Sequence, residues 1–334
     1  YLGGVMEHIE EAGIHSGDSS CTLPPITLGP DIIAKVKDAT EKIARGTGVR
    51  GLINIQFAYV SENLYVIEAN PRASRTVPFV SKATGVQLAK AAVLIGLGKT
   101  IAELKAEGYL PQHMDGASLP QETAIAVKAA VLPFARFRTP EGVVVDSLLS
   151  PEMRSTGEVM GLDQHFDTAF AKAQAGAGSP MPTSGKVFIS VANHDKRNVI
   201  IYAKMLESLG FEIVSTGGTA EILRRNGLNS ILVASKFAEA NGDHSIVDMV
   251  RNGDIDLILN TPAGGAARSD GYEIRAAAVS VGCPVMTTIS EFAAAVQAIT
   301  ALREHSWDIM SLQEHDVKLA AAVDARLASE GGEA

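Results

Sequence analysis

The chain has 334 residues, 46% of them hydrophobic, which is enough for two ordinary domains that each bury a core. Its formal net charge of -9 argues against a nucleic-acid-binding protein, because tracking a phosphate backbone requires clustered Lys and Arg. Without a run of about 18 apolar residues, we expect no membrane span. The only cysteines, Cys21 and Cys283, have no Cys-x-x-Cys spacing, which favours neither disulfides nor zinc and fits a reducing cytoplasm.

The first half of the chain predicts both helices and strands. It opens on Tyr1 rather than an initiator Met, so we interpret the chain as a fragment of a longer protein. Residues 31–45 place apolar side chains at helical spacing between a proline and two glycines, which predicts a helix. Residues 51–60 alternate apolar and polar side chains, and residues 64–70 continue after a polar break. This pattern predicts a β-hairpin.

Two more helices are expected before the composition changes, a buried one at 85–96 and a short one at 101–107. From Ala171 onward small residues become frequent, and the Gly and Pro residues at 176–185 indicate an irregular connector. We therefore predict a domain boundary near Thr183. The first domain, residues 1–183, should be α+β, and the second domain covers residues 184–334.

The second half alternates strands with helical stretches. Strands are expected at 187–191, 212–216, 230–234 and 256–260, a helix at 198–209, and a tail helix at 317–327. Strands that alternate with helices predict a parallel sheet, and ligands of such sheets bind at the carboxyl ends of the strands. The overall fold class is therefore α/β.

Polar side chains converge on the predicted hairpin. Glu68 and Asn70 lie two residues apart on one strand, so both project from the same face, and Gln56 on the partner strand can face them. Magnesium prefers oxygen ligands, usually one or two carboxylates with nucleotide phosphates, so this set is a candidate ATP–metal site. Arg72 and Arg75 follow and could clamp a transferring phosphoryl group. On spacing alone, a solvated strand face is the commoner explanation.

The longer string around these residues is more specific. Residues 66–82 read Val-Ile-Glu-Ala-Asn-Pro-Arg-Ala-Ser-Arg-Thr-Val-Pro-Phe-Val-Ser-Lys. This string strongly resembles the ATP-grasp signature of carbamoyl phosphate synthetase large subunits, and residues 151–161 extend the likeness. Related carboxylate–amine ligases carry only a shorter Glu-x-Asn-x-Arg core. The resemblance covers nearly the whole chain and implies part of the second ATP-grasp domain, followed by a methylglyoxal-synthase-like regulatory domain.

The resemblance also implies a reaction and its partners. The enzyme would transfer the γ-phosphoryl group of ATP to carbamate, giving carbamoyl phosphate for pyrimidine and arginine synthesis. Gln56, Glu68 and Asn70 would hold Mg²⁺ or Mn²⁺, and Arg72 and Arg75 would contact phosphoryl oxygens. The implied partners are the N-terminal remainder of the large subunit and a glutaminase small subunit. Because half of the nucleotide site is missing, we expect no activity from the isolated chain; a purely regulatory, effector-binding module is the alternative.

An acidic, glycine-containing segment precedes the hairpin. Residues 7–20 are interpreted as a short helix followed by a loop rich in oxygen acceptors, which could hold a cation or a nucleotide. A structural role for each partly buried histidine is the alternative. The resemblance implies a K⁺ site made by His8, Glu10, Glu11, Ile14 and Ser19. It places Ile14, His15 and Ser16 beside the nucleotide.

The resemblance further assigns a site for the activator ornithine to Glu10, Asp18 and Thr287. The family usually has a glutamate where this chain has Ala129, and that glutamate would contribute to the pocket. Loss of a charge-assisted hydrogen bond to a cationic amine costs about 1.5–3 kcal/mol. We therefore expect ornithine activation to be weakened.

An anion site is predicted at the strand ends of the second half. Lys196 follows its first strand, and Thr216-Gly217-Gly218-Thr219 follows the second. Such a turn offers hydroxyls and unobstructed backbone amides at a helix N-terminus, and Lys196 adds a positive charge. A plain strand-to-helix turn is the alternative. The resemblance implies a nucleotide monophosphate effector, bound also by Lys236 and Asn260. We expect no methylglyoxal synthase activity, because no aspartate base can be assigned.

Overall fold

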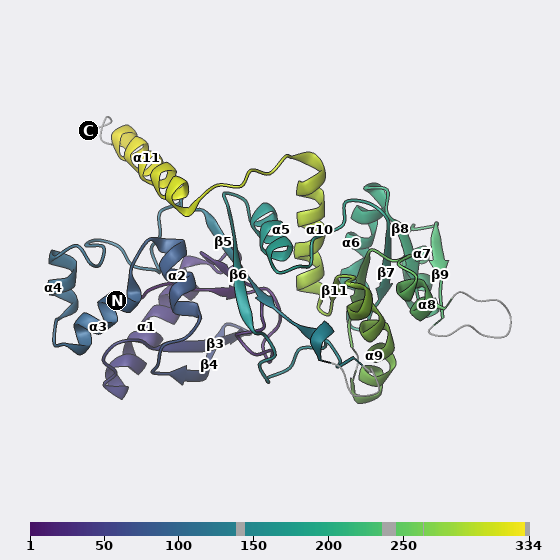
Figure 1. Cartoon of the computed structure of the whole chain (residues 1–334), viewed down its shortest axis with the longest axis horizontal. Helices are drawn as coiled ribbons and strands as arrows, with labels where there is room; N and C mark the ends of the chain where they lie inside the picture. The colour runs from purple at the N-terminus through teal and green to yellow at the C-terminus, as the bar shows by residue number, and fades with distance from the viewer. Residues whose placement is uncertain (138–143, 236–244, 263, 331–334) are drawn as a thin grey trace.

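A computed structural model describes residues 1–137, 144–235, 245–262 and 264–330. These residues form a four-stranded sheet, a separate two-stranded hairpin and a five-stranded sheet. The four-stranded sheet and the hairpin lie in one half of the molecule and the five-stranded sheet in the other (Figure 1). The first two belong to the predicted first domain and the third to the predicted second domain.

An antiparallel sheet organises the first half. Its strands, in spatial order, are β1 (Glu7–His8), β2 (Cys21–Leu23), β5 (Ile125–Val131) and β6 (Gly157–Asp163). Adjacent residues of β5 face opposite sides, so Val127 packs with Phe170 of α5 (Phe166–Gly176), while Ala126 packs with Phe79 of α2 (Thr76–Thr84). The predicted short helix at residues 7–11 is wrong: Glu7 and His8 pair with β2 and extend the sheet instead.

The predicted helix and hairpin are both confirmed. α1 (Pro30–Thr47) begins at a proline and ends at Gly48 in the left-handed conformation, where glycine carries no steric penalty. β3 (Asn54–Val60) and β4 (Asn63–Asn70) pair antiparallel around a turn at Ser61 and Glu62, whose φ angles are both positive. Such a turn matches the twist of the two strands.

Much of the hairpin's apolar surface faces solvent. Tyr65 is 56% exposed, Val66 51% and Ile67 53%, and α1 contains no fully buried residue. A two-stranded ribbon buries little surface by itself. Within the described residues, no further layer buries these side chains.

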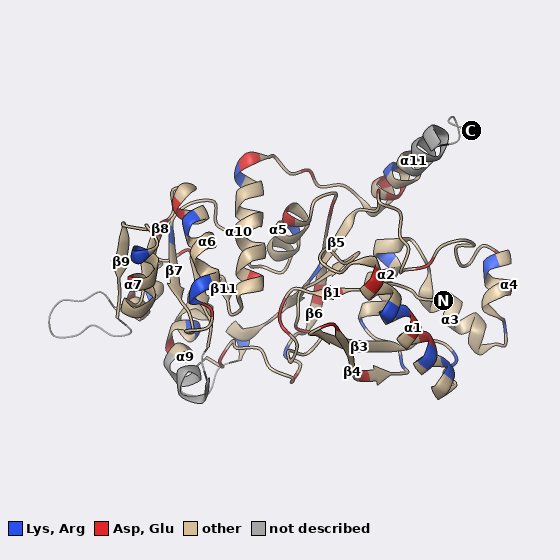
Figure 2. Cartoon of the chain, turned by 180° about the vertical axis from the view of Figure 1, so that it is seen from behind, with Lys and Arg blue, Asp and Glu red and all other residues tan. Residues whose placement is uncertain are grey.

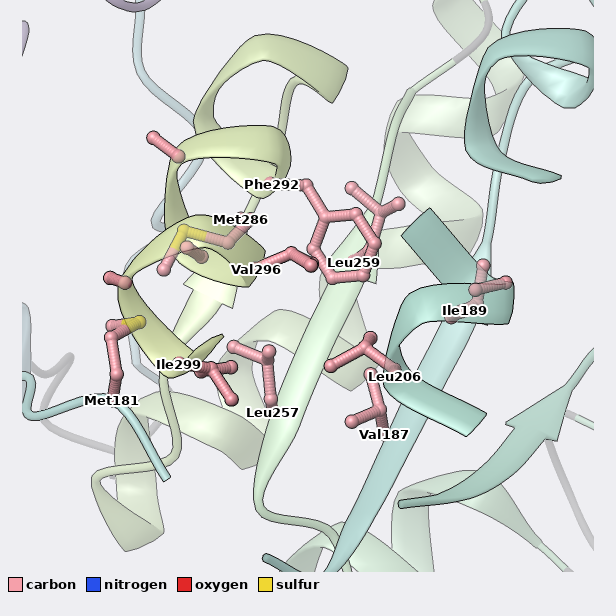
Figure 3. Close-up of a cluster of buried hydrophobic side chains, with 14 of the residues drawn as sticks. Met181, Val187, Ile189, Leu206, Leu257, Leu259, Met286, Phe292, Val296 and Ile299 are labelled. Carbon is pink, nitrogen blue, oxygen red and sulfur yellow. The ribbon is translucent and has the colours of Figure 1, made fainter. Parts of the chain in front are cut away.

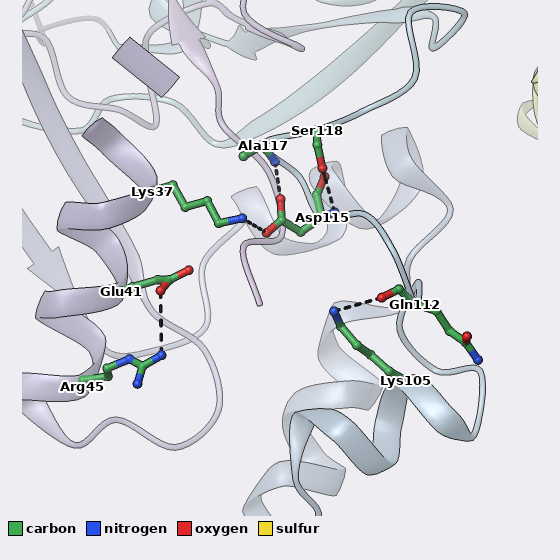
Figure 4. A network of polar contacts seen from close by, with 8 residues as sticks. All are labelled: Lys37, Glu41, Arg45, Lys105, Gln112, Asp115, Ala117 and Ser118. Carbon is green, nitrogen blue, oxygen red and sulfur yellow. Dashed lines mark hydrogen bonds and ion pairs between the residues drawn. The ribbon is translucent and has the colours of Figure 1, made fainter. Parts of the chain in front are cut away.

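Polar contacts fix α1 against the segment that leads into β5 (Figure 4). Lys37 Nζ lies 2.8 Å from Asp115 Oδ2, and Asp115 also accepts the backbone amide of Ala117 at 3.0 Å. Burial favours the protonated form of Asp115, but these donors hold its pKa below the ordinary value. The network keeps α1 in place beside the hairpin.

The two further helices predicted in the first half are both present, but one of them is less buried than predicted. α3 (Leu88–Gly96) and α4 (Ile101–Ala106) match the predicted ranges. The expected burial of α3 is wrong, because only its Ala91 is buried, and Val93 is 63% exposed. α3 packs on one side alone, where Ala91 contacts Leu104 and Leu110.

The second half contains the predicted parallel sheet, and helices cover both of its faces. Its strands, in spatial order, are β11 (Val285–Met286), β10 (Leu257–Asn260), β7 (Lys186–Ser190), β8 (Glu212–Ser215) and β9 (Ile231–Val233). The helices are α6 (Lys196–Ser208), α7 (Gly217–Arg225), α8 (Ile246–Arg251), α9 (Gly264–Val281) and α10 (Ile289–Glu304). The chain places β8 on one side of β7 and β10 on the other. The topological switch point of the sheet therefore lies between β7 and β10.

Alternating residues of the central strands build two cores. Val187 and Ile189 of β7 face α6 and α10, while Phe188 faces α8 and α9. Figure 3 shows the first core, where Phe292 of α10 lies among Ile189, Leu206 and Leu259. This core also includes residues of the first half.

α5 and α10 lie side by side between the two sheets, and their buried faces belong to one hydrophobic cluster (Figure 1). The small residues from Ala171 onward lie in α5, which runs to Gly176, and small side chains allow two helices to approach closely. Residues 177–185, between α5 and β7, contain no helix or strand, so the predicted irregular connector is confirmed. The boundary near Thr183 stays a prediction. After α10, α11 (Leu312–Glu330) forms the predicted tail helix.

Charged side chains are spread over both halves. Figure 2 shows Lys and Arg positions on helices of each half, interspersed with Asp and Glu. None of the helices in the described part of the chain is both long and apolar enough to cross a bilayer. One short 3₁₀ helix, η1 (Phe134–Arg136), follows β5 and lies near α9.

Candidate functional site

The hairpin brings two of the predicted metal residues together. Gln56 of β3 lies opposite Glu68 of β4, and its Nε2 donates 2.7 Å hydrogen bonds to Glu68 Oε1 and to Ser16 Oγ. Asn70 lies opposite Asn54 at the end of the same strand pair. The predicted nucleotide neighbour Ser16 therefore joins the hairpin, although 40 residues separate it from Gln56.

Arg75 is held at the edge of this site by several acceptors. Its Nη2 donates to Ser155 Oγ at 2.7 Å and to the Gly17 carbonyl oxygen at 3.5 Å. Ser155 Oγ also donates to the Gly17 carbonyl at 2.9 Å, so one serine fixes both the guanidinium and the loop. Arg72 is exposed, and its Nη1 donates to the Ala73 carbonyl oxygen. Of the two predicted arginines, Arg75 is the one that the loop holds in place.

Buried charged groups hold the glycine-containing loop. Lys128 of β5 is 2% exposed and donates from Nζ to the Ser16 carbonyl oxygen at 2.7 Å. Asp18 accepts the backbone amides of Arg154 and Ser155 at 2.8 and 2.9 Å. His15 accepts the Gly17 amide at Nδ1, and its own amide donates to the Ser150 carbonyl oxygen. The loop is therefore fixed from β5 and from residues 150–155.

The residues predicted to hold a monovalent cation occupy different environments. Burial, with a contribution from Lys128, lowers the pKa of His8 to about 4, so its ring is neutral at pH 7. Glu10 is buried and accepts the Ser20 amide at 2.7 Å, while Glu11 is exposed. Ser19 is fully buried and donates to the His15 carbonyl oxygen. Ile14 is half-buried on the same loop.

Of the residues predicted for ornithine, Glu10 and Thr287 both lie near Glu291, where the two halves meet, while Asp18 binds residues 154–155. Thr287 donates its amide to Glu291 Oε2 at 3.1 Å, and Glu291 is the first-turn acid of α10. Burial raises the pKa of Glu291, and the neighbouring Glu10 raises it further. Both carboxylate oxygens of Asp18 already accept backbone amides. Ala129 is buried in the core shared with α5 and supplies no carboxylate.

The predicted anion-binding residues Lys196 and Thr216–Thr219 meet at the carboxyl ends of the neighbouring strands β7 and β8. Thr216 is the residue that precedes α7, and its hydroxyl lies 3.2 Å from that of Ser190 at the end of β7. A Cβ built on Gly218 would lie 3.5 Å from Lys196 Nζ, so the lysine ammonium lies over the glycine turn. Thr219 is buried, and its hydroxyl accepts the Val191 amide at 3.4 Å.

Asn260 ends β10 on the other side of β7, and it donates to the Ser190 carbonyl oxygen at 3.5 Å. The strand ends of β7, β8 and β10 thus bring Lys196, the glycine turn and Asn260 to one edge. Lys236, the remaining predicted effector residue, lies outside the residues that the structure describes.

The sequence reasoning missed three buried polar residues that make long-range contacts: Lys128, Ser155 and Arg275. Each is buried and contacts a residue more than 70 positions away. A lysine inside an otherwise apolar strand, Ala126-Val127-Lys128-Ala129, was a signal that could have indicated the first of them.

Comparisons with known families relate a segment of each half of the chain to a described domain. Residues 4–104 match the family described as Carbamoyl-phosphate synthase L chain, ATP binding domain, and residues 198–287 match the MGS-like domain. The Carbamoyl phosphate synthase large chain of Kocuria rhizophila is 70% identical over 321 residues, which cover 96% of this chain and 29% of that protein. The chain is a relative of the carbamoyl phosphate synthase large chains.

Other large chains are similarly close. Those of Micrococcus luteus and Streptomyces coelicolor are 66% and 59% identical over 326 residues each, covering 97% of this chain and 30% of theirs. The chain thus spans about 30% of the length of the curated large chains that it matches. A biotin carboxylase domain of a single-chain bacterial carboxylase aligns at 21% identity and a TM-score of 0.34, over 48% of this chain and 39% of that one, too slight a likeness to establish a shared fold.

Proposed function

We propose that this chain supplies the metal- and phosphoryl-contacting part of an ATP-dependent carbamate phosphorylation site, together with a domain that binds a regulatory nucleotide. The observation that carries the proposal is the contact of Gln56 with both Glu68 and Ser16, beside Arg75. These residues lie in the range related to the large-chain ATP binding domain. The full reaction would transfer the γ-phosphoryl group of ATP to carbamate and yield carbamoyl phosphate.

The ligand types fit Mg²⁺ or Mn²⁺. Gln56, Glu68 and Asn70 offer side-chain oxygens, and magnesium sites in proteins commonly combine one carboxylate with nucleotide phosphates and water. Among the described residues, no group of three His, Cys, Asp or Glu side chains forms a self-sufficient metal cage. The nucleotide itself would therefore complete the coordination. A bound divalent ion would neutralise phosphate charge during transfer.

Arg75 would act on the transferring phosphoryl group. Its guanidinium is oriented by Ser155 and Gly17, so part of the entropy cost of ordering it is met before substrate binds. A preoriented cation stabilises charge that develops in the transition state more effectively than a mobile one. Arg72 would supply a second, less constrained contact.

The loop of residues 13–20 would border the nucleotide. Lys128 and Asp18 hold it rigidly, which would keep Ile14, His15 and Ser16 at the edge of the hairpin site. The neighbouring acidic groups, with Glu10 buried among them, would hold K⁺. We propose no strong ornithine site, because Ala129 removes a carboxylate and Asp18 already binds two backbone amides.

The remainder of the large chain would complete the site. Tyr65, Val66 and Ile67 are exposed apolar residues of β4 that the preceding part of the nucleotide-binding domain would cover. A glutaminase small subunit would supply ammonia to the full complex. Alone, the chain would bind effector without turnover, and this regulatory role is the second candidate function.

The proposal is tested with the full-length large chain and with the 334-residue chain. We expect the full-length protein to form ATP from ADP and carbamoyl phosphate, and the isolated chain to show no turnover. Absence of this reaction in the full-length protein would refute the catalytic role. Turnover by the isolated chain would refute the need for the remaining part of the site.

A further inference from the structure

A buried arginine joins the effector edge of the second half to the first half. Arg275 of α9 is fully buried and donates from Nε and Nη2 to the two carboxylate oxygens of Asp146, both at 2.7 Å. Its Nη1 donates to Asn260 Oδ1 at 2.8 Å. One guanidinium therefore binds the end of β10 and the segment that follows η1.

The space for this guanidinium is provided by a glycine. A Cβ on Gly271, one turn earlier in α9, would collide with Arg275 Nη1 and Asn260 Oδ1. Tyr272 adds a 2.7 Å hydrogen bond from its hydroxyl to the Val144 carbonyl oxygen. α9 thus binds residues 144–146 through two side chains.

The segment that starts at Asp146 ends in the phosphoryl site. Its Ser150 carbonyl oxygen accepts the His15 amide, and the amides of Arg154 and Ser155 bind Asp18. Ser155 Oγ then accepts from Arg75 at 2.7 Å. Asp146 and Ser155 are only nine positions apart in the chain, so a shift at one end displaces groups that hold Arg75 at the other.

The Arg275–Asp146 contact is stiff and directional. Burial alone would raise the pKa of Asp146, yet the hydrogen bonds from Arg275 and Leu148 hold it below its ordinary value, so the pair is ionised. A two-pronged guanidinium–carboxylate contact fixes both distance and orientation, which a single charge contact does not.

We infer that Arg275 is a positioning residue that couples the nucleotide-binding edge at Asn260 to Arg75 through residues 146–155. This inference rests on the proposed function of both sites. A nucleotide that displaces Asn260 moves the Arg275 guanidinium, and the carboxylate of Asp146 follows because both of its oxygens are bound. The result is a change in how Ser155 and Gly17 hold Arg75.

The decisive variant is Asp146→Asn in the full-length large chain with its glutaminase partner, because Asp146 lies outside both proposed pockets. The measured quantity is the ratio of kcat/KM for ADP, in ATP formation from carbamoyl phosphate, with and without saturating uridine or inosine monophosphate. Coupling between sites typically changes such constants about 5–150-fold. We expect Asp146→Asn to bring the ratio to within about twofold of one, while calorimetry still detects nucleotide binding.

Two controls separate coupling from general damage. Asp163→Asn breaks an equally short ion pair, with Lys172, inside the first half, and its ratio should equal that of wild type. Arg275→Lys keeps the charge without the two-pronged contact and should lose the response as Asp146→Asn does. A wild-type ratio in both Asp146→Asn and Arg275→Lys overturns the inference and leaves the proposed function intact.

A measurement on the wild type needs no variant. Hydrogen exchange of the peptide containing the Arg154 and Ser155 amides should change when the nucleotide monophosphate binds, and unchanged exchange there with bound nucleotide would contradict the coupling. If wild type neither binds the nucleotides nor responds to them, the regulatory function and the coupling both fail.

Discussion

Gln56 and Glu68 lie opposite each other in the hairpin, and a 2.7 Å hydrogen bond joins Gln56 Nε2 to Glu68 Oε1. Glu68→Gln keeps the shape of the side chain and an oxygen that can accept this hydrogen bond, but removes the only carboxylate of the proposed metal-binding set. In the full-length large chain we expect the rate of ATP formation from ADP and carbamoyl phosphate to fall roughly 100-fold or more, since transition-state charge is then poorly neutralised.

The matched control for Glu68 is Glu62→Gln at the hairpin turn, which removes one exposed carboxylate from the same ribbon. This variant should retain the wild-type rate. If Glu68→Gln were equally active, the metal assignment would be wrong, and circular dichroism of both variants would show whether the fold persists.

Lys196 tests the effector site. Its ammonium lies over the Gly217–Gly218 turn, where the amides at the start of α7 face an anion. Lys196→Ala should weaken binding of a nucleotide monophosphate by about 1.5–3 kcal/mol, roughly tenfold to a hundredfold in Kd. Isothermal titration with uridine and inosine monophosphates measures this loss.

Lys204→Ala, an exposed lysine later in α6, is the control for nonspecific charge effects, and its Kd should match wild type. Equal affinity of Lys196→Ala and wild type would place the phosphate elsewhere on the sheet.

Local sequence patterns predicted the parts of the site that lie on one element. The alternation at 51–60 and 64–70 predicted the hairpin, and the two-residue spacing of Glu68 and Asn70 follows from strand geometry alone. The Thr216–Thr219 turn was also predicted from a local pattern. It lies directly between a predicted strand and a helical stretch, which places it at the carboxyl end of that strand.

The contacts that support the site join residues far apart in the sequence, and no local pattern predicts such contacts. Lys128 and Ser16 are 112 residues apart, Arg75 and Ser155 are 80 apart, and Arg275 and Asp146 are 129 apart. β5 also escaped prediction, since its Ala-rich sequence with a central lysine lacks the β-branched alternation typical of strands. Only its pairing with β2 and β6 makes it a strand.

The acidic pair at the junction predicts a pH-dependent stability. Burial and the charge of Glu10 raise the pKa of Glu291 in the folded chain above its ordinary value of 4.5, while Lys128 partly offsets the effect of burial on Glu10. Between the two pKa values the folded state therefore binds more protons than the unfolded state. The protonated Glu291 contributes its full stability below the ordinary pKa of 4.5, and this stability is lost as pH rises through the folded-state pKa. Glu291→Gln, which can still accept the Thr287 amide, removes this loss.

We expect the melting temperature of Glu291→Gln to exceed that of wild type increasingly between about pH 5 and pH 8.5. Glu304→Gln, an exposed acid at the end of the same helix, should follow the wild-type pH dependence. A constant difference between Glu291→Gln and wild type across this range would contradict the raised pKa.

The shared core between α5, α6 and α10 predicts that one aromatic ring supports both halves. Phe292 is fully buried, its ring meets that of Tyr202 edge-on at 6.3 Å between centroids, and it lies in the cluster that also contains Phe170 of α5. Phe292→Ala should lower the free energy of unfolding by about 3–5 kcal/mol, because the loss of buried surface is compounded by a cavity that rigid neighbours cannot fill.

Leu97→Ala, at a site 78% exposed, should change the free energy of unfolding by no more than about 0.5 kcal/mol. Urea denaturation followed by circular dichroism compares the two. Because α10 packs on α5, which in turn packs on β5 and β6, we expect Phe292→Ala to lower the denaturation midpoint of the first half as well as the second. An unchanged midpoint for the first half would mean that the halves unfold independently.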